Sequence, residues 1–120
     1  MSTVNDYDDP KVCGAFLEQY TGLAPSFLGG LAYVDFGSEK TRVTLPSGGR
    51  TMGVYFDDRR VGHIDNPEWR SMPFGLVCAL VKLSRLDPDN LIVQDALNRA
   101  SDMPFDKRVT AGLVVLGGQL

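Results

Sequence analysis

The stretch that decides the fold is Val54-Tyr55-Phe56-Asp57-Asp58-Arg59-Arg60-Val61-Gly62-His63-Ile64, and it is typical of a tight β-hairpin. Two runs of β-favouring residues flank a charged centre. The stretch also carries His63, the only histidine of the chain. The pattern predicts part of the fold, but by itself it indicates no chemistry.

With the turn at Asp58 and Arg59, the two runs of the hairpin meet in pairs that antiparallel sheets commonly use. One pair is a cross-strand ion pair, and the others bring apolar side chains, glycine or histidine together. The expected pairs are Asp57 with Arg60, Phe56 with Val61, Tyr55 with Gly62, and Val54 with His63.

Length and charge limit the class of protein. The 120 residues suffice for one domain with a hydrophobic core, and 43% of them are hydrophobic. The formal net charge is −3, so nucleic-acid binding is disfavoured, because phosphate binding needs a basic surface. Basic residues outnumber acidic ones only in residues 31–64.

The cysteines and the termini indicate a compartment. Cys13 and Cys78 fall in apolar helical patterns, so we expect two buried free thiols in a reducing environment. Two cysteines and one histidine do not supply a zinc site, and we expect no metal and no cofactor. The polar start is not a signal peptide, and the longest apolar run, residues 74–81, is too short for a membrane span. We therefore expect a soluble cytoplasmic protein with no membrane partner.

The first half of the chain predicts one helix and four strands. Residues 1–8 are expected to form a flexible leader, and residues 9–120 a single domain. Asp8 or Asp9 can cap a helix that has Pro10 at its first position and ends at Gly22. A connection over residues 23–30 precedes strands over residues 31–36, 41–45, 52–57 and 60–64. Because the gaps are short and the side chains alternate, we expect an antiparallel meander with one covered face.

The second half predicts three helices. Ser71 caps the first, whose inner stripe is expected at Phe74, Val77, Leu80 and Val81. Asp87 is expected to cap the second, which residues 91–100 fill, and residues 105–116 fit a third. Residues 112–116 also fit a strand. The fold class is α+β: a four-stranded antiparallel sheet with one N-terminal helix and three C-terminal helices packed on one face.

Basic side chains of the sheet region and the loop after it are the candidate contacts to a protein partner. Trp and Arg are the residue types richest in interface hot spots. An ordinary solvated surface, or for the tryptophan a lid over the core edge, is the alternative. The candidates are Arg42, Arg59, Arg60, Trp69 and Arg70.

Two further groups of residues allow other functions. The loop residues Ser47, Gly48, Gly49 and Arg50 could form a phosphate-binding nest, although Walker spacing is absent and a plain turn is the alternative. His63 could act as a catalytic base oriented by Asp65, but no motif places a serine or cysteine nucleophile beside it. On the expected register His63 faces the covered side with Val54, as a structural histidine would.

Residues 54–64, followed by Pro67-Glu68-Trp69, resemble the short N-terminal hairpin of HipA-like toxin kinases, where a V-x-x-n-x-x-x-V-G hairpin precedes a P-E-W-like segment. The kinase's catalytic loop and ATP-binding elements lie elsewhere in that family and have no counterpart here, so the resemblance implies a similar hairpin only.

Three functions remain. The first is a small cytoplasmic non-enzymatic binding protein that docks on another protein, as inhibitors, immunity proteins, phage anti-defence proteins and adaptors do. The second is a small-ligand or nucleotide-binding module, and the third is a small enzyme that uses His63.

Overall fold

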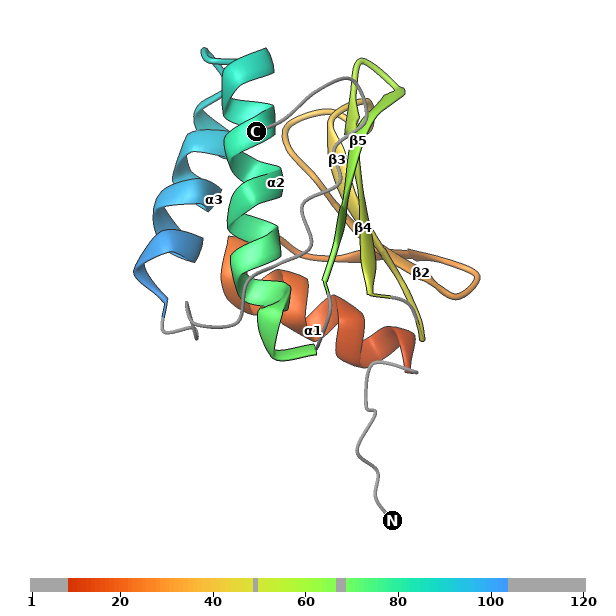
Figure 1. The fold of residues 1–120 in the computed structure, drawn as a ribbon. Coiled ribbons are helices and arrows are strands. Elements are labelled where there is room, and N and C mark those ends of the chain that lie inside the picture. The colour runs from red at the N-terminus through yellow and green to blue at the C-terminus, as the bar shows by residue number, and fades with distance from the viewer. Residues whose placement is uncertain (1–8, 49, 67–68, 104–120) are drawn as a thin grey trace.

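The computed structural model describes residues 9–48, 50–66 and 69–103. Along this part of the chain one helix comes first, the strands follow it, and the remaining helices come last (Figure 1). In chain order they are α1 (Pro10–Thr21), β1 (Ser26–Leu28), β2 (Leu31–Asp35), β3 (Arg42–Pro46), β4 (Thr51–Phe56), β5 (Arg59–Asp65), a 3-10 helix (Trp69–Ser71), α2 (Met72–Leu86) and α3 (Leu91–Asp102).

The strands form one antiparallel sheet in chain order, from β1 at one edge to β5 at the other. Helix α1 lies against β2 and β3, and α2 lies against β4 and β5. Helix α3 packs on α1 and α2, so the helices all lie on the same side of the sheet (Figure 1). The predicted α+β class with an antiparallel sheet is confirmed, and the described residues contain two of the three helices expected after the sheet.

The expected number of strands is wrong: within the described residues the sheet has five strands and not four. Residues that we assigned to a connection form β1, in which Ser26 to Leu28 pair with Tyr33 to Leu31. Gly29, with a φ of 59°, supplies the left-handed residue that this tight turn needs. The expected leader over residues 1–8 and the expected helix over residues 105–116 lie outside the described residues.

The β4–β5 hairpin is present, but its register differs from the expected one. The turn residues are Asp57 and Asp58, with φ angles of 55° and 63°. Aspartate tolerates this conformation, and a two-residue turn of this kind matches the twist of the strands. Phe56 therefore pairs with Arg59, and Tyr55 pairs with Arg60. The expected ion pair of Asp57 with Arg60 is wrong, as are the expected pairings of Phe56 and Tyr55.

An irregularity between Val54 and Tyr55 shifts the rest of this hairpin by one residue. Val54 pairs with Gly62, so the expected pairing of Val54 with His63 is also wrong, and His63 lies opposite Gly53. Val54 and Ile64 are buried on the helix side. Because side chains alternate along a strand, His63 lies on the other face, where 18% of its side chain is exposed.

The starts of α1 and α3 follow local capping rules, whereas Ser71 is at the N-cap of α2 as expected but makes no capping hydrogen bond with its side chain. Asp9 accepts a hydrogen bond from the Lys11 N–H at 2.9 Å, and Gly22 ends α1 with a φ of 76°, as expected. The expected cap of α3 is wrong. Asp87 instead ends α2, because its N–H donates to the Leu83 carbonyl at 2.8 Å. Asn90 caps α3.

Helix α2 forms the centre of the core. Leu76, Leu80 and Leu83 are fully buried, whereas Phe74 and Val77 are only half-buried at its flank. The expected stripe is thus rotated, because α2 packs against both the sheet and α3.

The two cysteines are free, as expected. Cys13 is buried in the core, but the expectation of full burial is wrong for Cys78, which is half-buried. Burial raises the pKa of the Cys78 thiol above its usual value.

Candidate functional site

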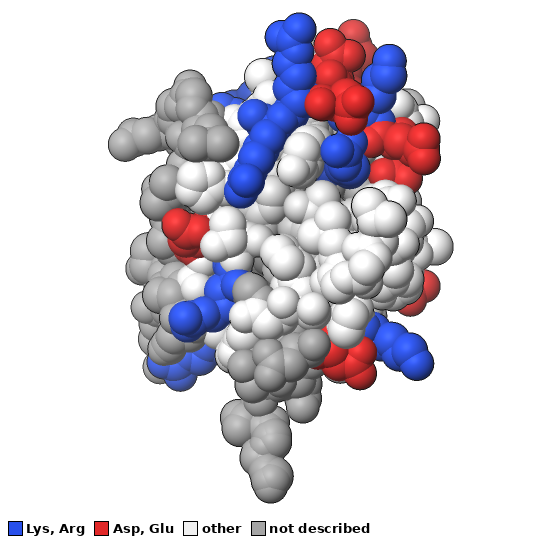
Figure 2. All heavy atoms as spheres, turned by 90° about the vertical axis from the view of Figure 1, so that its right-hand side faces the viewer, with Lys and Arg blue, Asp and Glu red and all other residues white. Residues whose placement is uncertain are grey.

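The candidate site lies on the open face, which we define as the sheet face opposite the helices. In β2, Ala32 and Val34 are buried beneath α1, so Leu31 and Tyr33 point to the open face. In β3 and β4 the same alternation brings Thr44 and Tyr55 to this face. Figure 2 shows that the middle of this side of the molecule carries mostly uncharged side chains, whereas Lys, Arg, Asp and Glu lie around it, with the largest group at the top.

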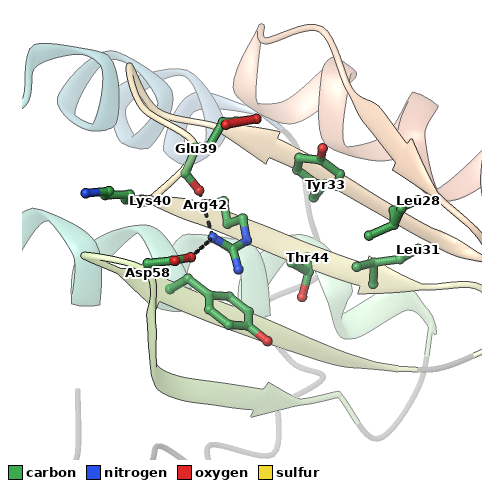
Figure 3. A pocket seen from close by; sticks show the side chains of 9 residues that line it. Leu28, Leu31, Tyr33, Glu39, Lys40, Arg42, Thr44 and Asp58 are labelled. Atoms are coloured by element: carbon green, nitrogen blue, oxygen red, sulfur yellow. Dashed lines mark hydrogen bonds and ion pairs between the residues drawn. The ribbon is translucent and has the colours of Figure 1, made fainter.

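A shallow groove of about 360 Å³ runs over β3 on the open face, and we call it the β3 groove. Figure 3 shows that Leu28, Leu31 and Tyr33 approach from β1 and β2. Tyr55 of β4 also lines the groove. Thr44 forms part of the floor between them. These side chains form the apolar part of the groove, and Leu28 is 72% exposed.

The other end of the β3 groove is charged and is lined by Glu39, Lys40, Arg42 and Asp58. Arg42 Nη1 donates to Asp58 Oδ1 at 3.0 Å and to the Glu39 carbonyl at 2.7 Å (Figure 3). The Arg42 guanidinium carbon also lies 4.1 Å from the centre of the Tyr55 ring. Three contacts therefore hold this guanidinium in one orientation, in the manner of a cation–π pair with a charge-assisted hydrogen bond.

Nη1 donates both hydrogen bonds of the Arg42 side chain. Within the described residues, Nε and Nη2 of Arg42 have no hydrogen-bond partner. The side chain is 23% exposed, so a ligand can reach it. An arginine offers donors in a fixed planar fork, and the Nε–Nη2 edge is one that a carboxylate can bind with both oxygens.

Asp35 lies beside Arg42, because the two residues are paired across β2 and β3. Burial raises the pKa of the Asp35 carboxyl and Glu39 raises it further, while Arg42 opposes both effects. Its Oδ1 atom is buried without a hydrogen-bond partner in the described part of the chain. One carboxylate in an unfavourable setting thus lies next to Arg42, although it does not line the groove itself.

The structure divides the predicted partner-binding residues into two groups. Arg42 and Arg60 lie at the hairpin end of the open face, since Arg60 pairs with Tyr55. Arg59 is exposed at the hairpin tip but pairs with Phe56, which packs on the core side. Trp69 and Arg70 instead line a second pocket, of about 280 Å³, against α1. In Figure 1 the β4–β5 turn and the start of α2 lie at opposite ends of the molecule.

Trp69 is half-buried and packs against the hydrophobic core. The Arg50 guanidinium carbon lies 5.7 Å from the centre of its indole ring. Phe16 and Tyr20 of α1 complete the aromatic wall of this pocket, with their ring centroids 4.9 Å apart. These contacts fit the alternative reading of Trp69 as a lid over the edge of the core.

The loop of residues 47–50 is already engaged with its surroundings. The Ser47 N–H donates to the Gly30 carbonyl at 2.7 Å. The Arg50 carbonyl accepts from the Asn66 N–H at 3.1 Å and from Asn66 Nδ2 at 2.8 Å. Gly48 has a φ of 75°, as a turn glycine does, and Gly49 lies outside the described residues. A nest at Ser47, Gly48, Gly49 and Arg50 stays a prediction from the sequence.

His63 is accompanied by the acid that the sequence suggested, but not in a catalytic geometry. Its Nε2 lies 3.8 Å from Asp65 Oδ2, which is beyond hydrogen-bond distance. The other oxygen of Asp65 accepts from Thr51 Oγ1 at 2.6 Å, so that carboxylate is oriented by the threonine. Nδ1 of His63 is buried and has no partner within the ranges that the structure covers.

Two classes of site are absent from the described residues. No group of three or more His, Cys, Asp or Glu side chains is arranged there to hold a metal ion. In the same residues, every helix is too short or too polar to cross a bilayer.

Sequence reasoning missed the apolar side chains of the β3 groove. Leu28 lay in an assumed connection, and Leu31, Tyr33, Thr44 and Tyr55 were assigned to strands but given no function. The alternation of β2 and β3 contains the signal, because it puts Tyr33 and Thr44 on the face away from the core. Which face the helices cover depends on contacts between distant parts of the chain, and no local pattern states it.

Comparison with known proteins adds no relationship: no family model, curated protein or solved structure matches the chain.

Proposed function

We propose that this chain is a small cytoplasmic binding protein without enzymatic activity, which acts by docking another protein on the open face of its sheet. Inhibitors, immunity proteins, phage anti-defence proteins and adaptors work in this manner. The observation that carries the proposal is the row formed by exposed Leu28 and half-buried Tyr33 and Tyr55 beside a fixed arginine. Tyrosine and arginine are the residue types that interface hot spots favour.

The shape of the open face supports a protein partner over a small molecule. Small ligands are bound in deep clefts that bury most of their surface. The β3 groove is instead shallow and continuous with the surrounding sheet face (Figure 2). A broad apolar centre with a charged rim is the usual anatomy of a protein interface.

The proposal refines the set of residues predicted from the sequence. Arg42 and Arg60 remain in the interface, as the fixed and the peripheral cation of the open face, and Arg59 stays at its edge in the hairpin tip. Trp69 and Arg70 lie elsewhere and are assigned to packing against α1. Leu28, Leu31, Tyr33 and Tyr55 join the interface in their place.

The proposal is tested by differential capture from cells of the source organism. Tagged full-length chain, the Leu28→Arg variant and the Leu91→Arg variant are used as baits, and bound proteins are identified by mass spectrometry. Leu28 is 72% exposed on the open face, and Leu91 is 73% exposed on α3, so the two variants change equally exposed positions on different surfaces. We expect one partner that Leu28→Arg loses and Leu91→Arg keeps.

Two results would contradict this function. If only the Leu91→Arg variant loses the partner, the interface lies on the helices and not on the open face. If no partner is captured but a nucleotide raises the melting temperature, the alternative of a small-ligand module that uses residues 47–50 gains support.

A further inference from the structure

The β3 groove combines two recognition elements at a fixed separation. At the charged end, Arg42 presents its unpartnered Nε–Nη2 edge. At the apolar end, Leu31 pairs with Pro46, which lies four residues further along β3. At a rise of about 3.3 Å per residue, the two ends are therefore about 13 Å apart.

The charged end selects the type of group that can bind there. Because Asp58 and Glu39 occupy only Nη1 of Arg42, the guanidinium plane is fixed while its other edge stays open. A carboxylate accepts two parallel hydrogen bonds from such an edge. The Tyr55 ring beneath the guanidinium keeps water from one of its faces, which strengthens the interaction.

The charges around Arg42 restrict the class of partner. Lys40, Arg59 and Arg60 are balanced by Glu39, Asp57 and Asp58 in the same region of the chain. A polyanion such as a nucleic acid gains nothing from a balanced rim, since its binding depends on an excess of cations. A single carboxylate that meets the open edge of Arg42 needs no such excess.

The length of the groove decides between a small carboxylate and a segment of protein. A free carboxylate can fill only the Arg42 end, and would leave Leu28 and Leu31 uncovered. An extended segment of about four residues spans the same distance of about 13 Å. Its apolar side chain can cover the two leucines and Tyr33 while its carboxylate reaches Arg42.

We infer that the β3 groove binds an extended protein segment that carries an Asp, Glu or terminal carboxylate a few residues from a large apolar side chain. This inference rests on the proposed function, because it names the chemistry of the partner that the open face would dock. Arg42 binds the carboxylate, and Leu28, Leu31 and Tyr33 bind the apolar side chain.

The test begins with a phage-displayed library of random peptides selected on the full-length protein. We expect the enriched sequences to share an acidic residue near a large apolar residue. The best binder is then synthesised together with its matched amide, in which Asp becomes Asn or Glu becomes Gln. The amide should bind roughly tenfold more weakly, because it cannot form the charge-assisted pair.

Three variants locate the binding. Leu28→Ser should weaken binding of the acidic peptide by about tenfold, since burial of a leucine side chain contributes at least that much to the affinity. Leu91→Ser removes an equally exposed leucine from α3 and should leave the affinity unchanged. Arg42→Lys keeps the charge but loses the planar fork, and should reduce the preference for the acid over its amide. Circular dichroism and melting curves establish that each variant is folded.

Each other result overturns the inference. If the enriched peptides bind equally well as acid and as amide, while a partner is still captured through Leu28, the carboxylate plays no part in recognition. The proposed function would then remain intact. Sensitivity to Leu91→Ser, or a selection that enriches nothing, would remove the groove as a peptide site. Equally tight binding of N-acetyl aspartate would show that a small carboxylate suffices. Loss of both peptide binding and partner capture would overturn the proposed function as well.

Discussion

Arg42 reaches from the beginning of β3 to Asp58 in the β4–β5 turn, with 3.0 Å between Nη1 and Oδ1. The same nitrogen bonds the Glu39 carbonyl in the loop that precedes β3. One side chain thus connects two loops at the same end of the sheet. Asp58 also donates its backbone N–H to the Lys40 carbonyl at 2.8 Å, which reinforces the connection.

We expect the Arg42–Asp58 pair to contribute a small but measurable coupling energy. Asp58 is 65% exposed, so solvent weakens the attraction, and about 0.2–1 kcal/mol is the range for such pairs. A double-mutant cycle with Arg42→Gln and Asp58→Asn, followed by urea unfolding, measures it. The matched cycle with Arg59→Gln and Asp58→Asn should give a coupling near zero. Equal coupling in the two cycles would mean that Asp58 pairs with neither arginine specifically.

Asn90 is expected to be the most important cap in the described chain. Its Oδ1 accepts from the N–H groups of Ile92 and Val93 at 3.0 and 3.2 Å, and its Nδ2 donates to the Phe36 carbonyl at 2.9 Å. Asn90→Ala should therefore lower the free energy of unfolding by about 1–2 kcal/mol. Asn90→Asp should lose about as much, because it keeps the cap but loses the Nδ2 bonds to the Phe36 carbonyl and to Asp87 Oδ2, and it puts two carboxylates side by side.

Asp89→Ala is the control for the cap of α3, since Asp89 is exposed beside Asn90. Its effect on chemical denaturation should stay within about 0.5 kcal/mol. A larger loss of unfolding free energy for Asp89→Ala than for Asn90→Ala would show that a neighbouring aspartate, and not Asn90, caps α3.

The elements that the sequence predicted well are those with local signals. Asp9 and Pro10 start α1 and Gly22 ends it, because the capping groups and the helix are neighbours in the chain. Three-residue β1 escaped prediction, since a strand this short shows almost no alternation. Asn90 was missed because Asp87 is also a good cap, and only the end of α2 decides which of them is used.

Only some of the side chains on the open face could be located from the sequence. Strand alternation puts Arg42 and Arg60 on the bare sheet face, whereas Arg59 points to the other side, and the role of these side chains in binding stays a prediction. Trp69 could not be located from sequence, since its position depends on how α1 packs against the 3-10 helix. The bulge in the β4–β5 hairpin likewise follows from the pairing of whole strands, and it moved His63 to the other face.

Asp35 should make stability depend on pH. Burial and Glu39 raise its pKa in the folded state, so folding favours the protonated form. Its contribution is therefore most favourable below its ordinary pKa of 3.8 and is lost as the pH rises through the higher folded value. Asp35→Asn should raise the melting temperature at neutral pH, and the difference should vanish in strong acid. An increase that is the same at all pH values would show that ionisation of Asp35 is not the cause.

Two helix glycines provide the sharpest test of the packing, because they face different neighbours. A Cβ at Gly75 of α2 would collide with Asn66 Oδ1, and Asn66 is buried and held by two bonds to the Arg50 carbonyl. A Cβ at Gly14 of α1 would meet the outer end of the Phe27 ring, which is 49% exposed and can turn away.

Alanine at both positions gains the same helix propensity, about 1 kcal/mol, so the neighbours decide the sign of the change. Gly14→Ala should leave the melting temperature unchanged or raise it. Gly75→Ala should lower it, since overpacking costs about 1–3 kcal/mol and Asn66 has no space to move into. Adding Asn66→Ala to Gly75→Ala should cost less than the two single changes together, because the smaller side chain removes the collision. Strict additivity, or stabilisation by Gly75→Ala, would show that Asn66 does not lie against α2 in solution.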